Sequence, residues 1–160
     1  MTISLREYRE EDQAQIARLF DDFQDYLVAL DHWHRLRRLP GCGAQFLDET
    51  LKEVHEQQGY FYVALADDMI VGFVVGTIEK LKNRLDVIDS TVGRITELYV
   101  DAAFRGQGIG TQLMEHVERY LRTNRCDVVK VEVFVPNLPA RRLYEKFGYQ
   151  HRDIDSMKKL

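Results

Sequence analysis

A glycine-rich turn between an apolar run and an amphipathic segment constrains this chain more than any other feature. Residues 95–100 predict a buried strand, and residues 109–121 have the periodicity of an amphipathic helix. Between them, Gly106, Gly108 and Gly110 alternate with other residues. Glycine lets the backbone approach a ligand closely, and the first amides of a helix have no partner within it. We therefore expect this turn to bind an anion, specifically the pyrophosphate of a cofactor.

Two widespread phosphate-binding loops do not fit this turn. The dinucleotide fingerprint G-x-G-x-x-G requires a glycine where the chain has Thr111, and no acidic residue ends the following strand to bind a ribose. The loop of nucleoside triphosphatases requires Gly-Lys-Ser/Thr, and the turn has no lysine. Nicotinamide and nucleoside triphosphate cofactors are therefore disfavoured.

Composition limits the class of protein. The 160 residues contain no linker or repeat, so a single domain over residues 1–160 is expected. The net charge of -4 argues against non-specific nucleic-acid binding, and no apolar run approaches the ~20 residues of a membrane span. Cys42 and Cys126 form no CxxC pair and are interpreted as free thiols of a cytoplasmic protein without a signal peptide. The histidines join no Cys or Glu cluster, so no metal site is expected.

Hydrophobic periodicity predicts the element order β-α-α-β-β-β-α-β-α-β. Strands are predicted over residues 2–8, 60–66, 70–78, 94–100 and 128–135, with one or two closing strands in 149–160. A first helix, with Asp12 as its candidate cap, is predicted to run through Leu30. Further helices are predicted over residues 44–57, 109–121 and 138–147, and residues 81–90 are predicted to loop. This order indicates an α/β fold, a mixed sheet covered on both faces. Residues 94–135 should form a parallel strand–helix–strand unit with a right-handed crossover.

Two motifs carry a family resemblance. Arg105-x-x-Gly108-x-Gly110 matches the Q/R-x-x-G-x-G/A signature of the GCN5-related N-acetyltransferases (GNAT superfamily) at every specified position. The preceding Glu97-Leu98-Tyr99-Val100 is similar to that family's strand before the loop. Asn137-x-x-Ala140-x-x-Leu143-Tyr144-Glu145-Lys146-x-Gly148-Tyr149 resembles its second landmark, N-x-x-A-x-x-L-Y-x-K-x-G-F, with Tyr149 at the last aromatic position. The detailed resemblance covers roughly residues 59–150.

The resemblance implies an acetyl-CoA-dependent N-acetyltransferase of the GNAT fold. In that fold a mixed, mostly antiparallel sheet has helices on both faces, and a splayed pair of parallel strands takes the pantetheine arm. The implied cofactor-binding residues are Leu98, Tyr99, Val100, Arg105, Gly106, Gln107, Gly108, Gly110, Thr111, Asn137, Ala140 and Tyr144. Two roles stay open from the residues alone. Arg105 either places its charge near phosphate or only braces the loop. Asn137 bonds the cofactor or caps the helix that follows it, and one side chain can do both.

The resemblance also implies a reaction in which acetyl-CoA and a primary amine meet in a ternary complex and the amine attacks directly. Tyr144 would protonate the departing CoA thiolate, for which a phenol with a pKa of about 10 is suitable. Glu97 is the candidate base that deprotonates the amine, directly or through water. The alternatives are a packed helix tyrosine and a solvent-facing or ion-paired strand glutamate. The runner-up function is a non-catalytic acyl-CoA-binding or sensor domain of the same fold.

The acceptor side is the least specific part of the sequence. Asp25, Tyr26, Trp33 and Tyr99 are candidate acceptor-binding residues, because carboxylates and aromatic rings suit a cationic amine. The alternatives are a solvated helix face for the acids, neutralisation by the arginines of residues 35–38, and core packing for Tyr99. The expected acceptor is a small-molecule amine or a protein amino group. Dimerisation is common among members of the family, and the C-terminal strands are a plausible contact.

Overall fold

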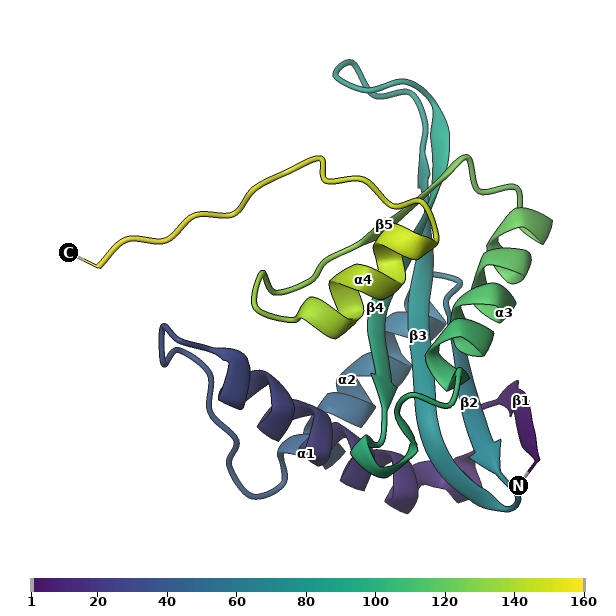
Figure 1. Ribbon diagram of the computed structural model, residues 1–160. Helices are drawn as coiled ribbons and strands as arrows, with labels where there is room; N and C mark the ends of the chain where they lie inside the picture. Colours follow the sequence, from purple (N-terminus) through teal and green to yellow (C-terminus); the bar gives the residue numbers. More distant parts are fainter. Residues whose placement is uncertain (1, 160) are drawn as a thin grey trace.

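The computed structural model describes residues 2–159, which form a five-stranded sheet with helices on both faces (Figure 1). Its elements are β1 (Ile3–Glu7), η1 (Glu10–Asp12), α1 (Gln13–Leu30), α2 (Cys42–Glu56), β2 (Tyr60–Ala66), β3 (Met69–Leu81), β4 (Ser90–Val100), η2 (Ala102–Phe104), α3 (Ile109–Thr123), β5 (Val128–Val131) and α4 (Leu138–Lys146). The strand order is β1-β2-β3-β4-β5, antiparallel except for the parallel pair β4 and β5. The predicted α/β class, with its mostly antiparallel mixed sheet, is confirmed.

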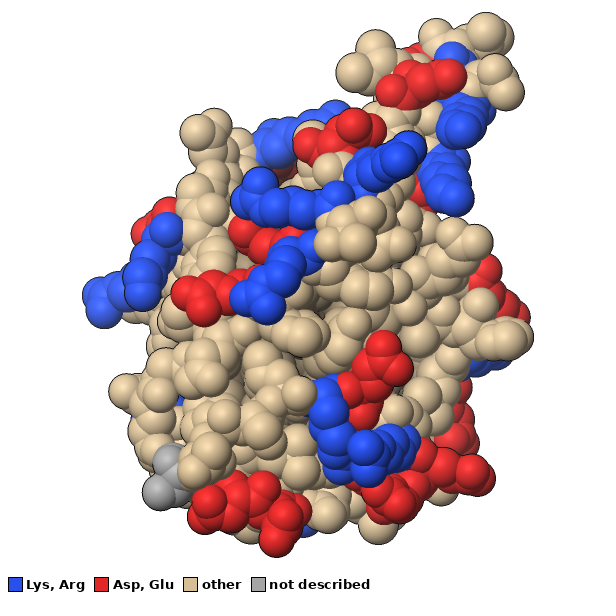
Figure 2. Space-filling view, turned by 90° about the vertical axis from the view of Figure 1, so that its right-hand side faces the viewer, with Lys and Arg blue, Asp and Glu red and all other residues tan. Residues whose placement is uncertain are grey.

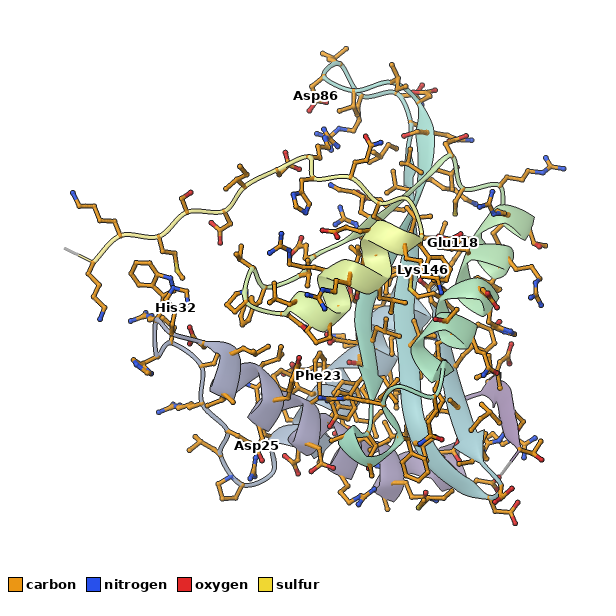
Figure 3. All side chains as sticks on the ribbon, in the orientation of Figure 1. Phe23, Asp25, His32, Asp86, Glu118 and Lys146 are labelled. Carbon is orange, nitrogen blue, oxygen red and sulfur yellow. The ribbon has the colours of Figure 1, made fainter. Side chains whose placement is uncertain are left out.

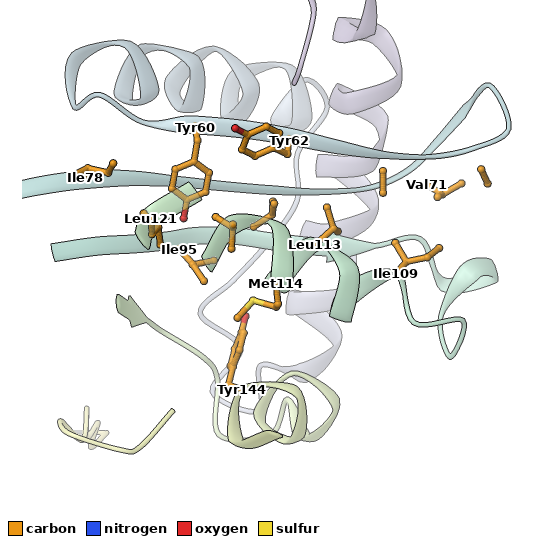
Figure 4. Close-up of a cluster of buried hydrophobic side chains, with 14 residues drawn as sticks. Tyr60, Tyr62, Val71, Ile78, Ile95, Ile109, Leu113, Met114, Leu121 and Tyr144 are labelled. Atoms are coloured by element: carbon orange, nitrogen blue, oxygen red, sulfur yellow. The ribbon is translucent and has the colours of Figure 1, made fainter. Parts of the chain in front are cut away.

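The two sheet faces bury separate hydrophobic cores. α1 and α2 cover one face, where Ile16, Leu19 and Leu47 pack with Phe73. α3 and α4 cover the other face, where a buried cluster gathers the apolar side of α3 (Figure 4). Because both faces are covered, every residue of β2 is buried, which explains its continuous apolar sequence.

A β-bulge in β4 determines which residues face which core. Val75 of β3 pairs with Glu97, but the next residue, Gly76, pairs with Ile95, so Thr96 is the extra residue of β4. Ile95 lies in the core under α3, whereas Tyr99 lies in the core under α1 and α2. Side chains alternate along a strand, so without the extra residue Tyr99 would share the face of Ile95. The bulge therefore turns Tyr99, and Glu97 with it, toward the α1 side.

The parallel pair β4 and β5 is short and then parts. β5 pairs with β4 only from Val128–Val92 to Val131–Ile95. The strand predicted to continue to Val135 instead ends at Val131, although its apolar alternation continues. The predicted extension was wrong because alternation reports which side chains are buried, while a strand also needs a paired neighbour. The two chain segments separate beyond these last paired residues.

The closing strands predicted for residues 149–160 are not observed in the part of this segment that the structure describes. Residues 149–159 have no regular secondary structure; Tyr149 packs against the core, and the segment after it extends away from the body of the molecule (Figure 1). Most of their side chains are polar and exposed, and even the apolar Ile154 is 88% exposed. A segment that buries so little apolar surface gains little from docking on the sheet. Residue 160 lies outside the described residues.

Other boundaries moved by a few residues. α2 begins at Cys42, two residues before the prediction, because Gly41 with φ +85° begins the helix in the left-handed conformation. β3 and β4 are longer than predicted and form a hairpin that projects beyond the sheet, leaving residues 82–89 as its tip (Figure 1). On the face seen in Figure 2, acidic and basic side chains are intermixed over the body of the molecule.

Candidate active site

The glycine turn has the geometry of an anion site. Gly106 and Gly108 have φ values of +77° and +79°, in the left-handed region that favours glycine. Gly108 is the N-cap of α3, and no side chain caps this helix end. A Cβ atom at either glycine would meet nothing within 4 Å, so the backbone conformation, not crowding, selects glycine here. The first amides of α3 are therefore available to an external acceptor, as the sequence predicted for a phosphate site.

Arg105 folds back onto the protein. Its Nε donates a hydrogen bond of 2.9 Å to the carbonyl oxygen of Val100. Its guanidinium lies 4.5 Å from the ring centroid of Tyr26 and 5.4 Å from that of Tyr99. This geometry matches the bracing alternative for Arg105, with the backbone amides left to meet an anion.

Asn137 acts as a helix cap and as the partner of a distant tyrosine. Its Oδ1 accepts a hydrogen bond of 3.4 Å from the backbone amide of Ala140 in the first turn of α4. The same oxygen accepts a hydrogen bond of 2.9 Å from the hydroxyl of Tyr26 in α1. The capping alternative is therefore what the structure contains, and Asn137 also ties α4 to a helix from the other side of the sheet.

Tyr144 of α4 is a largely buried phenol beside the gap between β4 and β5. Only 7% of the residue is exposed, and its ring lies near Met114 of α3 (Figure 4) and 5.8 Å from the Tyr149 ring. Burial, and secondarily the charge of Glu97, raise the pKa of Tyr144 to about 12. At neutral pH this phenol is protonated and can donate a proton.

Glu97 has a pKa raised into the neutral range. Burial raises its pKa to about 7, and the neighbouring charge of Glu53 in α2 adds to this effect. Among residues 2–159 Glu97 forms no salt bridge, so the ion-paired alternative is not what the structure contains. Its charge also contributes to the raised pKa of Tyr144, so Glu97 of β4 and Tyr144 of α4 lie within electrostatic reach of each other. A carboxyl group with a pKa near 7 suits proton transfer at neutral pH.

A pocket marks the point where the parallel strands part. It has a volume of about 170 Å³ and is lined by Ile95, Thr96, Val131 and Glu132, together with two basic residues, Arg94 and Lys130. The lining consists of the last two paired residues of each strand and the residue that follows them. Beyond it, β4 has an edge toward this gap with no strand beside it, and such edges pair with extended, amide-bearing ligands.

The four candidate acceptor residues are not gathered in one place. Tyr26 and Tyr99 both contact the guanidinium of Arg105. Asp25 instead accepts a 2.6 Å hydrogen bond from Arg38 Nε, and Figure 3 shows Asp25 and Phe23 on different sides of α1. Trp33 lies in the loop after α1 beside His32, at 5.6 Å between ring centroids. The structure therefore brings together the two tyrosines only.

The loop after α1 is organised by one carboxylate that sequence reasoning did not single out for this role. Asp31 accepts backbone hydrogen bonds from Trp33 at 3.0 Å, Arg35 at 2.5 Å and Leu36 at 2.7 Å. These hydrogen bonds lower the pKa of Asp31, and the bond from Leu36 has the largest effect. An Asp before a polar stretch is the only sequence signal for such a loop.

The comparisons with known proteins bear directly on this site. The sequence profile of the Acetyltransferase (GNAT) family matches residues 7–149, which is most of the chain. The chain belongs to the GNAT acetyltransferase family. The match includes the glycine turn, β4 and α4, so the resemblance identified from two motifs is confirmed.

Two curated relatives of this GNAT chain are named N-acetyltransferases. An uncharacterized N-acetyltransferase of Methanocaldococcus jannaschii is 36% identical over 95 residues, covering 59% of this chain and 54% of the relative. An N-alpha-acetyltransferase of Sulfolobus acidocaldarius is 36% identical over 108 residues, covering 66% of this chain and 62% of the relative. The match thus spans less than two thirds of either relative. Both names support the predicted enzyme class, N-acetyltransferase.

Solved structures confirm the fold of the GNAT domain. A mutant protein from Bacillus halodurans has a TM-score of 0.87 at 19% identity, with 98% of this chain and 99% of that chain covered. A putative acetyl transferase from Pyrococcus furiosus has a TM-score of 0.75 at 20% identity, with 99% and 100% covered. Within residues 2–159, no helix has the length and apolar character needed to cross a bilayer, and no three His, Cys, Asp or Glu side chains are grouped as metal ligands.

Proposed function

We propose that this GNAT domain is an acetyl-CoA-dependent N-acetyltransferase that moves an acetyl group to a primary amine by direct attack in a ternary complex. The observation that carries the proposal is that Glu97, two residues beyond the last β4–β5 pair, has a pKa raised to about 7 and contributes by its charge to the pKa of Tyr144, which is raised to about 12. One group is suited to accept a proton at neutral pH and the other to donate one.

The residues present fit acetyl-CoA. The uncapped amides of α3, from Gly108 to Thr111, would bind the pyrophosphate, and the left-handed glycines keep that approach free of side chains. The edge of β4 from residue 96 to Val100 would bond the amides of the pantetheine arm. Acetyl-CoA supplies the activated thioester; the protein supplies orientation and proton transfer.

Proton transfer follows from the two pKa values. Glu97 would accept a proton from the bound ammonium group, directly or through water, which leaves a neutral nucleophilic amine. Backbone amides near Val100 would stabilise the negative charge that develops on the thioester carbonyl oxygen as the C–N bond forms. Tyr144 would then give its proton to the CoA thiolate as the C–S bond breaks. The products are an N-acetylated amine and free CoA.

The acceptor is proposed from the relatives. Because the relative from Sulfolobus acidocaldarius is named an N-alpha-acetyltransferase, an α-amino group of a protein or peptide is the first acceptor to test, followed by small amines. The single-domain organisation over residues 1–160, the cytoplasmic location and a homodimer stay predictions.

The experiment measures acetyl-CoA binding by thermal stabilisation and CoA release with a panel of peptides and small amines. A ligand that binds only the folded state raises Tm in proportion to its concentration. Stabilisation together with amine-dependent CoA release supports the enzyme. Stabilisation without release from any amine favours the acyl-CoA sensor domain, and no stabilisation overturns the cofactor assignment.

A further inference from the structure

We propose, resting on the function proposed above, that Tyr26 is a positioning residue of the acyl-transfer site. Its ring and hydroxyl join two parts of the site that are far apart in sequence, Arg105 of the glycine turn and Asn137 at the start of α4. Tyr26 itself comes from α1, which packs on the opposite face of the sheet from α4.

The hydroxyl bond determines the orientation of the Asn137 amide. The backbone amide of Ala140 can only donate, so the group of Asn137 that faces it must be the acceptor Oδ1. The Tyr26 hydroxyl, 2.9 Å from the same oxygen, must then donate as well. Both protein partners therefore occupy Oδ1, and Nδ2 bonds no acceptor among residues 2–159. Its two N–H groups are left for the carbonyl groups of an amide-bearing ligand.

The Tyr26 ring supports the cofactor turn. The guanidinium of Arg105 lies over this ring at 4.5 Å and is anchored by its bond to the Val100 carbonyl, 2.9 Å away. A cation over an aromatic face is stabilised by the ring quadrupole. Because Arg105 also approaches the ring of Tyr99, at 5.4 Å, a protein cation already contacts both rings. Tyr26 therefore contributes to the donor side of the site.

The core holds Tyr26 in place. Phe23 lies one helical turn earlier on α1, and its ring contacts that of Tyr99 at 5.2 Å between centroids. Phe23 also meets Phe73 of β3 edge-on at 6.4 Å. The position of the Tyr26 hydroxyl is thus set by packing on the α1 face of the sheet.

α4 needs such a tie at its N-terminus. β5 ends at Val131, so residues 132–137 have no strand ladder to hold them. Within this segment the backbone makes a local turn, in which the backbone N–H of Asn137 donates a hydrogen bond of 2.9 Å to the carbonyl oxygen of Phe134. The bond from Tyr26 spans 111 positions of the chain and connects this turn to the core. Because α4 carries Tyr144, a shift of its N-terminus displaces both Asn137 and the proton donor.

The test compares Tyr26→Phe with wild type. This variant keeps the ring under Arg105 and deletes the hydroxyl alone. We expect the KM for acetyl-CoA to rise about threefold to tenfold, the effect of one net hydrogen bond, with a smaller fall in kcat. Tyr8→Phe is the matched control, because its hydroxyl makes no side-chain hydrogen bond within residues 2–159 and its ring stacks on Phe61 at 4.9 Å. The control should leave both constants unchanged.

Two further variants separate positioning from stability. Asn137→Asp keeps the capping oxygen, so Tm should hold while the KM for acetyl-CoA rises through loss of the Nδ2 donors. In the double variant with Asn137→Ala, Tyr26→Phe should add no further effect. An unchanged KM in Tyr26→Phe, or full additivity in the double variant, overturns the positioning role. If acetyl-CoA fails to stabilise the wild-type chain, the proposed function falls and this inference falls with it, whereas normal wild-type binding with an inert Tyr26→Phe removes the inference alone.

Discussion

The two sides of the site differ in what their polar groups are bonded to. On the donor side, the first amides of α3 have no side-chain cap, and β4 has an edge without a neighbouring strand beyond Ile95. On the α1 side, the carboxylates are already engaged: Asp31 binds three backbone amides and Asp25 binds Arg38. Backbone groups without a hydrogen-bond partner can bind a ligand, whereas carboxylates that already accept hydrogen bonds from the protein stabilise the conformation of a loop.

This difference teaches that composition alone misjudges a binding surface. The acidic and aromatic residues after residue 20 have side chains suited to a cationic amine, but most of these side chains already bind other groups of the protein. The glycine turn has little side-chain chemistry, and its backbone is what remains available. The predictions below test the donor side first, where the expected effects are largest, and then the α1 side.

The largest effect is expected for Tyr144→Phe. Removing the proton donor should lower kcat roughly 100-fold or more, the usual contribution of a general acid, and leave acetyl-CoA stabilisation intact. Tyr149→Phe is the control, because the buried Tyr149 hydroxyl has no hydrogen-bond partner among residues 2–159 and its ring lies beside Tyr144. Steady-state kinetics on both variants measure the contrast. Equal kcat values for the two variants would remove Tyr144 from the reaction.

A pH-dependent loss is expected for Glu97→Gln. In the wild type the base works only when deprotonated, so kcat/KM should rise with pH until the pKa of about 7 and then level off. In the variant, kcat/KM should be roughly tenfold to 100-fold lower at pH 8, and its pH profile should have no inflection near 7. Glu53→Gln is the informative companion, because removing that charge lowers the pKa of Glu97 and moves the inflection to lower pH. An inflection that persists in Glu97→Gln belongs to another group.

A smaller effect is expected for Gly108→Ala. The left-handed conformation at φ +79° costs a residue with a Cβ about 1–2 kcal/mol, so the turn should relax and the affinity for acetyl-CoA should fall roughly tenfold. Gly110→Ala is the control, since Gly110 has no positive φ and a Cβ there meets only the Leu143 side chain at 3.4 Å. Calorimetric titration with acetyl-CoA measures both. A Gly110→Ala loss as large as that of Gly108→Ala would contradict the conformational explanation.

The smallest effect is expected on the α1 side, for Asp31→Ala. Loss of three backbone partners should lower Tm and raise the KM for the acceptor amine, with acetyl-CoA affinity unchanged. Since the pKa of Asp31 is lowered, the stability that it contributes is present above the usual pKa of Asp and is lost as pH falls through the lowered value. Comparing Tm at pH 7 and at acid pH checks this sign. A change in acetyl-CoA affinity would show that the loop acts on both sides of the site.

The sequence by itself determined the element order, the glycine turn and the family. These features are local: a strand, a left-handed turn and a helix N-terminus follow each other within residues 95–121, and periodicity reports which faces are buried. The same local rules overextended β5 and added closing strands after Tyr149, because pairing with a neighbour is not written in a strand's own residues.

Only the tertiary structure decided how the site is assembled. The bulge at Thr96 turned Tyr99 toward the α1 face, and burial near Glu53 raised the pKa of Glu97 into the neutral range. Packing of Tyr26 against the core on the α1 face placed its hydroxyl on Asn137, 111 residues away. Bulge pairing, desolvation and contacts across the sheet depend on distances between segments that are far apart in the chain. The sequence therefore specified the donor-side parts, and the folded sheet determined how they meet.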